Sequence, residues 1–306
     1  MTVFPYLHWF RTALLTLVLA SCAGAPADPV SDPPRAGTLV PLGGEDGPVI
    51  AFALGGGAAR GFAHVGVLNV LERNGIHANL VVGTSAGSLA GALYAAGLRG
   101  QRLEEEALQL ERETFTDFGF PDRGLIRGER LQQYVNEAVG GLPLEDLPTR
   151  FAAVATDLGS GESAVFNGGD TGMAVRASSS FPGLVQPVRI NGRDYVDGGL
   201  VSQVPVHVAL SLGADVVIAV DVSKLPVDAE RVESTLDVLR QALLIMSMAL
   251  VERDVSDADV VIRPDVSGIK LAEFAARAGA IKAGERAAEK MLPEIHAAIA
   301  GARGTF

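Results

Sequence analysis

The sequence predicts an α/β fold in which helices flank a central, mostly parallel sheet. Two observations indicate it: short apolar runs alternate with longer amphipathic stretches, and no internal repeat is visible along the 306 residues. The expected strands are residues 49–54, 80–83, 151–156 and 216–222. The expected helices are residues 59–74, 85–96, 103–114, 233–253 and 271–300.

Local signals support several of these elements. Gly75 and Gly97 end the first two helices, because glycine readily takes the left-handed conformation after a helix. Residues 242–251 are apolar almost all round but too few to cross a bilayer, which predicts a buried core helix, with membrane contact as the alternative. Residues 186–196 read as a hairpin around Asn191-Gly192, a pair that suits the positive φ angles of a type I′ turn. The chain after this hairpin therefore starts at a strand end.

Composition excludes several classes of protein. The chain is 48% hydrophobic and 20% charged, as expected of a globular protein, and we expect one domain over residues 48–300. Its net charge is −11 and it has no basic run, so nucleic-acid binding is not expected. Its single cysteine excludes an internal disulfide and any CxxC metal site.

The first fifty residues resemble a targeting segment. Residues 12–20 are an apolar run of signal-peptide length, and Leu19-Ala20-Ser21-Cys22 resembles the bacterial lipoprotein box. The resemblance implies that residues 1–21 are removed, that Cys22 is lipidated, and that the protein is anchored in the bacterial cell envelope, facing the periplasm on the outer membrane. Residues 22–47 then form a flexible tether, given their Pro, Ala and Gly content. The alternative is a plain secretory signal with a nearby cysteine.

A glycine-rich loop follows the first expected strand and opens a helix. Its residues are Gly55-Gly56-Gly57-Ala58-Ala59-Arg60-Gly61. Bare backbone amides at a helix start can face a negative charge. The spacing does not fit a dinucleotide site, and no GK[ST] follows for a P-loop. The loop is either an anion cradle or a tight turn without a ligand.

A second motif, Gly83-Thr84-Ser85-Ala86-Gly87, lies between a strand and a helix. A GxSxG in that setting predicts a nucleophile elbow, in which the turn lifts the serine hydroxyl above the sheet. The sequence therefore predicts Ser85 as a nucleophile.

A nucleophilic serine needs a base, and two kinds are available. Among the histidines, His64 is more typical of a packed helix residue, while His207 could complete a Ser-Asp-His order. Asp197, in the Asp-Gly-Gly that follows the hairpin, could instead accept the Ser85 proton directly, because partial burial raises the basicity of a carboxylate. Alone, this motif would be a simple turn.

Together the motifs resemble a known family. In chain order, GGGAARG, GTSAG, ASSSFPGLVQP (residues 177–187) and DGG are similar to the four blocks of the patatin-like phospholipases, and the resemblance covers nearly all of residues 48–300. It implies a three-layer patatin-like fold and a Ser-Asp dyad without histidine. Ser85 is then the nucleophile and Asp197 its base. The implied oxyanion-hole amides are those of Gly56, Gly57 and Ala58, and the implied supporting loop residues are Gly55, Arg60 and Gly61.

The resemblance implies a serine lipid acyl hydrolase, of phospholipase A or lysophospholipase type, that works through an acyl-enzyme without a metal or other cofactor. Its substrate would be a phospholipid or lysophospholipid. The alternative is a non-catalytic lipoprotein that binds lipid or a partner on the same fold. One departure is visible, since many relatives have glycine where this chain has Ala58. Residues 101–141, with Phe115, Phe118 and Phe120, are either a cap over an acyl groove or a solvated helix pair.

Overall fold

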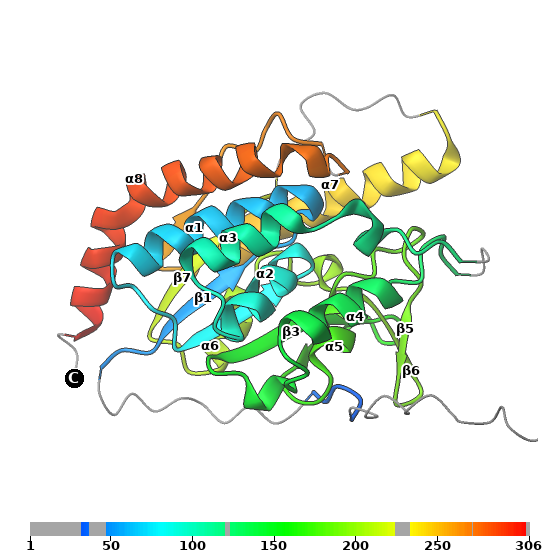
Figure 1. Cartoon of the computed structure of the whole chain (residues 1–306), viewed down its shortest axis with the longest axis horizontal. Helices are drawn as coiled ribbons and strands as arrows, with labels where there is room; N and C mark the ends of the chain where they lie inside the picture. The colour runs from blue at the N-terminus through cyan, green and yellow to red at the C-terminus, as the bar shows by residue number, and fades with distance from the viewer. Residues whose placement is uncertain (1–31, 37–46, 120–122, 224–232, 271, 304–306) are drawn as a thin grey trace, which may run out of the picture. The chain divides into compact units, whose positions relative to one another are not determined.

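The structure is a computed structural model that describes residues 32–36, 47–119, 123–223, 233–270 and 272–303. Residues 32–306 belong to one unit, in which helices cover both faces of a central sheet (Figure 1). The expected signal peptide, Cys22 and most of the expected tether lie outside the described residues.

Within the described residues the sheet has eight strands, in the order β5-β6-β3-β2-β1-β7-β8, with β4 paired to β3. Parallel pairing joins β3, β2, β1, β7 and β8, whereas β4, β5 and β6 pair antiparallel, so the expected mostly parallel sheet is confirmed. The strands are β1 (Ile50–Leu54), β2 (Leu80–Thr84), β3 (Arg150–Asp157), β4 (Ser163–Phe166), β5 (Val188–Ile190), β6 (Arg193–Asp197), β7 (Val216–Val220) and β8 (Val260–Ile262).

The helices and the sheet form three layers. Alternate residues of β1 enter different cores: Phe52 and Leu54 join the cluster that includes α1 and α8, whereas Ala51 and Ala53 join the cluster beneath α6 and α7. The helices are α1 (Phe62–Arg73), α2 (Ala86–Ala95), α3 (Gly100–Gln109), α4 (Glu129–Ala138), α5 (Thr171–Ser178), α6 (Val206–Ser211), α7 (Thr235–Val255) and α8 (Arg277–Arg303).

The expected hairpin is confirmed as β5 and β6. Asn191 and Gly192 have φ angles of 50° and 84°, as a type I′ turn requires. The register then sets Asp197, the last residue of β6, opposite Ala155 of β3. The hairpin thus places Asp197 beside β3, the next strand of the sheet.

Two expectations are corrected. Residues 242–251 are not a buried core helix: Ile245 and Met246 of α7 are 56% and 66% exposed, because α7 buries only its last turn, with Val251 and Val255, in the core. Within the expected tether, residues 32–36 lie against residues 167–170. The Arg35 amide donates to the Gly168 carbonyl at 2.7 Å. Backbone pairing therefore holds a segment whose composition alone would leave it free.

Helices α1 and α8 approach each other at glycine. A Cβ added to Gly66 would lie 1.9 Å from the carbonyl oxygen of Ile281, and one added to Gly284 would lie 2.0 Å from that of Ala63. Both neighbours are backbone atoms that cannot rotate away. The helix contact therefore requires the absence of a side chain at both positions.

Candidate active site

Ser85 occupies a strained turn between β2 and α2. Its φ and ψ are 52° and −120°, which places a non-glycine residue in a sparsely populated region. The two glycines of the motif make this turn fit. A Cβ on Gly83 would lie 2.5 Å from the Gly87 carbonyl oxygen, and one on Gly87 would lie 2.0 Å from that of Leu54. The backbone is that of a nucleophile elbow.

Ser85 and Asp197 meet directly. The Ser85 hydroxyl donates a hydrogen bond of 2.7 Å to Oδ2 of Asp197. The other carboxylate oxygen accepts the Gly199 amide at 2.8 Å. Asp197 is only 6% exposed, and this burial raises its pKa to about 6, although both hydrogen bonds act to lower it. The site therefore holds a carboxylate with raised basicity against a serine hydroxyl.

The end of α5 aligns both members of this pair. The buried Ser178 hydroxyl accepts the Ser85 amide at 2.9 Å and donates to the Val154 carbonyl at 2.6 Å. Two residues later, the Ser180 carbonyl accepts the Asp197 amide at 2.9 Å. The sequence alone does not indicate a separate role for Ser178. The signal that could have found it was its place in the third motif, beside the other three.

Ser178→Ala is expected to lower the free energy of unfolding by about 1–3 kcal/mol, because it removes a buried hydroxyl and leaves the partly buried Ser85 amide without an acceptor. Thermal unfolding measures this loss. Ser179→Ala is the matched control, since this neighbouring side chain is only half-buried and makes no hydrogen bond with the elbow among the described residues, and its stability should stay close to that of the wild type. Equal stability of the two variants would contradict the role given to Ser178.

The glycine loop lies against the elbow. A Cβ on Gly56 would lie 3.3 Å from the Cβ of Ser85. Gln203 holds Gly56 from both sides: its carbonyl accepts the Gly56 amide at 3.0 Å, and its Nε2 donates to the Gly56 carbonyl at 2.8 Å. This differs from the expectation that the Gly56 amide faces the oxyanion. The Gly57 and Ala58 amides donate to no group among the described residues, so they remain as the available donors.

Ala58, which stands where the resemblance places a glycine, has a positive φ of 49°. A left-handed conformation costs a non-glycine residue about 1–2 kcal/mol, and glycine avoids this cost. Glycine in turn makes the unfolded chain more flexible, which lowers the free energy of unfolding by about 0.5–1 kcal/mol. Ala58→Gly should therefore stabilise the protein by about 0.5–1 kcal/mol in thermal unfolding. Ala59→Gly, next to it but without a positive φ, should destabilise it instead. A lower melting temperature for Ala58→Gly would contradict this account.

The side chains of His64 and Arg60 hold the glycine loop through hydrogen bonds. His64 is fully buried, and its Nε2 contacts the Gly55 carbonyl at 2.8 Å. Burial lowers its pKa to about 4, so the ring is neutral at pH 7 and Nε2 carries the proton in this contact. Nε of Arg60 donates to the Ile269 carbonyl at 2.9 Å. At Gly61, an added Cβ would lie 2.4 Å from that of Ala86, so loop and elbow pack without space between them.

The other candidates fall elsewhere. Nδ1 of His207 lies 3.4 Å from Oδ2 of Asp257, a surface pairing that does not involve the Ser85–Asp197 contact. Phe115 stacks on Phe274 with ring centroids 4.8 Å apart, which favours a packed segment there, whereas Phe118 is 71% exposed. Phe120 lies outside the described residues.

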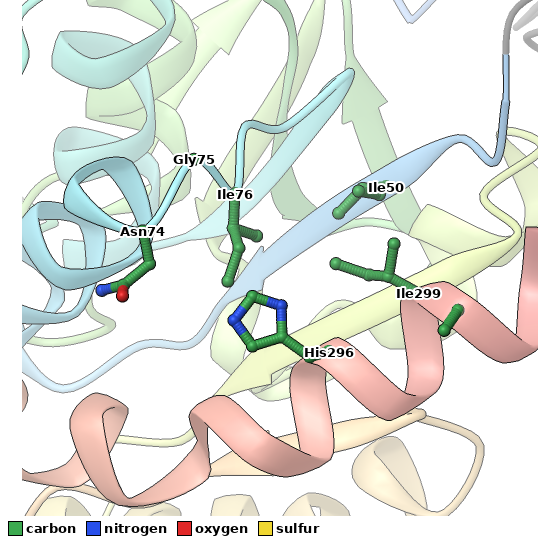
Figure 2. Close-up of a pocket in the computed structure, with 7 residues that line it drawn as sticks. Ile50, Asn74, Gly75, Ile76, His296 and Ile299 are labelled. Atoms are coloured by element: carbon green, nitrogen blue, oxygen red, sulfur yellow. The ribbon is translucent and has the colours of Figure 1, made fainter.

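A cavity of about 400 Å³ lies between α8, the start of β1 and the turn that follows α1 (Figure 2). It is lined by Ile50, Ile76, Ile299 and the exposed His296, among others. Ile50 is the first residue of β1, whereas the glycine loop follows the last. The cavity is therefore separate from the elbow. Within the described residues, no cluster of His, Cys, Asp and Glu could hold a metal ion, and no helix has the length and apolarity to cross a bilayer.

Comparison with known proteins accounts for this arrangement. The family profile described as patatin-like phospholipase matches residues 52–210, just over half of the chain, and spans the glycine loop, the elbow and the Asp-Gly-Gly turn. The chain belongs to the patatin-like phospholipase family. The expected family is thus confirmed, and so is the three-layer fold with its mostly parallel sheet.

Relatives and a solved structure agree with the family. An uncharacterized NTE family protein of Mycobacterium tuberculosis is 36% identical over 183 residues, which cover 59% of this chain and 51% of the relative. Patatin-like phospholipase domain-containing protein 6 of Homo sapiens is 34% identical over 184 residues, 58% of this chain and 13% of that protein. The chain therefore matches about half of the first relative and about an eighth of the second. VipD from Legionella pneumophila shares the fold, with a TM-score of 0.55 at 14% identity, over 79% of this chain and 66% of VipD.

Proposed function

We propose that this patatin-like protein is a serine lipid acyl hydrolase of phospholipase A or lysophospholipase type. The observation that carries the proposal is the 2.7 Å hydrogen bond from the Ser85 hydroxyl to the buried Asp197 carboxylate. A relative points the same way: Lysophospholipase NTE1 of Scheffersomyces stipitis is 33% identical over 180 residues, 56% of this chain and 12% of that protein.

The reaction follows from the contacts. Oγ of Ser85 attacks the carbonyl carbon of a lipid ester while its proton passes to Oδ2 of Asp197. The amides of Gly57 and Ala58 stabilise the tetrahedral oxyanion. Its collapse breaks the ester bond, and Asp197 returns the proton to the leaving alcohol. Water, deprotonated by Asp197, then attacks the acyl-enzyme; the acyl–oxygen bond to Ser85 breaks, Asp197 returns the proton to Oγ of Ser85, and the fatty acid leaves.

A phosphonate probe tests the nucleophile. A fluorophosphonate carrying an alkyl chain should form one covalent adduct with the folded protein, mapped to Ser85 by mass spectrometry, and should block hydrolysis of a chromogenic fatty-acid ester. Ser179→Ala should be labelled like the wild type. An unlabelled Ser85 in a protein that still hydrolyses the ester would refute the proposal.

His207→Ala separates the dyad from the histidine-containing triad. Because His207 pairs with Asp257 at the surface, this variant should keep the ester hydrolysis rate of the wild type. Loss of activity in His207→Ala, with Ser85 still labelled by the probe, would favour the triad.

We also propose that the protein is a membrane-anchored lipoprotein of the bacterial envelope. Support comes from the sequence around Cys22 alone, since this segment lies outside the described residues. Metabolic labelling with a fatty acid should mark the wild type and not Cys22→Ser. An equally labelled Cys22→Ser protein would contradict the proposal.

A further inference from the structure

Helix α7 turns an apolar face to solvent. Between residues 238 and 249, every described side chain that is exposed is apolar, and Val238, Leu239, Ile245 and Met246 are 56%, 57%, 56% and 66% exposed. Spacings of three, four and seven residues place them on one side of the helix. We call Val238, Leu239, Ala242, Ile245, Met246 and Ala249 the apolar arc. A water-facing arc without polar groups over three turns is unusual and marks an interaction surface.

The apolar arc is attached to the proposed active site. Beyond the arc, α7 buries Val251 and Val255 in the core beneath the sheet. The buried Asp254 of the same turn accepts the Val204 amide at 3.1 Å, next to the Gln203 that holds the glycine loop. The helix also packs against η4 (Gly198–Leu200), the turn that directly follows Asp197. Figure 1 shows the first half of α7, in yellow, at the periphery of the fold.

We propose that the apolar arc of α7 docks on the surface of a lipid bilayer and sets the Ser85–Asp197 site beside it. This inference rests on the proposed function, because a lipid hydrolase must take its substrate from an aggregated surface. An apolar helix face buried at the headgroup boundary binds in proportion to its apolar area. No described side chain of the arc is charged, so this binding is insensitive to salt. The chain carries a net charge of −11, so the surface it fits is zwitterionic and not anionic.

The test uses the full chain with Cys22→Ser in every sample, so that no attached lipid contributes, and vesicles of phosphatidylcholine. Ile245→Asp and Met246→Asp, singly and together, place a carboxylate on the arc. Leu158→Asp is the matched control, because Leu158 is 50% exposed in a turn after β3, outside α7. Vesicle flotation, phosphatidylcholine hydrolysis in vesicles and hydrolysis of a soluble short-chain ester are measured in parallel.

The double variant is expected to lose flotation and to hydrolyse vesicle lipid about tenfold more slowly, while its rate on the soluble ester stays that of the wild type. Leu158→Asp should behave as the wild type in all three assays, and high salt should not release the wild type from vesicles. Unchanged flotation and vesicle hydrolysis in the double variant would overturn docking. So would a wild-type dimer in solution that the same substitutions convert to monomer, since the arc would then bind a second copy. If neither ester is hydrolysed, the proposed function fails, whereas flotation still reports on docking.

Discussion

Asp197→Asn is expected to lower kcat for ester hydrolysis by about 10²–10⁴-fold, the usual contribution of a general base. Asparagine keeps the size of the side chain and can still accept the Gly199 amide, but it cannot take the Ser85 proton. In the wild type, the same requirement fixes the pH dependence: kcat/KM should rise as pH increases through about 6, the pKa that burial gives Asp197, and then level off. A rate independent of pH between 5 and 7 would contradict the assignment of Asp197 as the base.

The same substitution should stabilise the fold at neutral pH. Because the folded-state pKa of Asp197 is raised, its protonated form favours folding below the unfolded value of 3.8, and this stability is lost as pH rises through about 6. The shift in the pKa of Asp197 corresponds to about 3 kcal/mol. This value is the upper limit of the free energy of unfolding that Asp197→Asn can gain at pH 8. Denaturant unfolding at pH 8 and at pH 4 measures the gain, which should fall to about 0.5 kcal/mol at pH 4, close to the unfolded pKa.

Asp157→Asn is the control for Asp197→Asn, because the pKa of Asp157 is lowered whereas that of Asp197 is raised. Asp157 lies on β3, two residues beyond the partner of Asp197, and accepts the Arg193 guanidinium at 2.6 Å, which lowers its pKa. Removing that charge should weaken the fold and leave kcat unchanged. A loss of activity equal to that of Asp197→Asn would mean that both carboxylates act through structure alone.

Gly66→Ala is expected to destabilise the protein by about 3 kcal/mol, at the upper end for an overpacked contact, because the added methyl group meets the Ile281 carbonyl oxygen. The two helices must separate to admit it, and the oxygen has no rotamer with which to move. In a domain of this size, 1 kcal/mol shifts Tm by about 2–4 °C, so a drop of roughly 6–12 °C is expected.

Gly279→Ala is the matched control on α8. Gly279 is exposed and an added Cβ would meet nothing within 4 Å, so the variant gains helix propensity of about 0.5–1 kcal/mol and a slightly higher Tm. Similar Tm values for the two variants would show that α1 and α8 do not depend on this close approach.

Much of this fold could be predicted from local signals. Strands of the parallel sheet are apolar on both faces, so they can be recognised as short apolar runs. The hairpin can be recognised from two residues that take positive φ angles. Strands β4 and β8 were not predicted, because four or three residues carry too little periodicity. The burial of helix α7 was predicted wrongly: an apolar composition predicts burial, whereas only Val251 and Val255 in the last turn of α7 reach the core.

Of the candidate site, only the two residues of the proposed dyad could be predicted to meet. Ser85 and Asp197 stand in motifs whose local backbone determines where the side chains emerge. By contrast, Gln203 and Ser178 act through contacts that join positions more than ninety residues apart in sequence, such as Ser178 with Ser85. No pattern of neighbouring residues in the sequence predicts such a contact. The commitment of the Gly56 amide to Gln203 was missed for the same reason.

The buried, neutral His64 beneath the glycine loop has a consequence in acid. Its lowered pKa withdraws stability as pH falls from 6.5 towards 4, whereas protonation of Asp197 adds stability between about 6 and 3.8. These opposing contributions largely cancel near pH 5. Mild acidification should therefore silence the enzyme by neutralising its base while the fold persists, and a return to neutral pH should restore turnover without refolding.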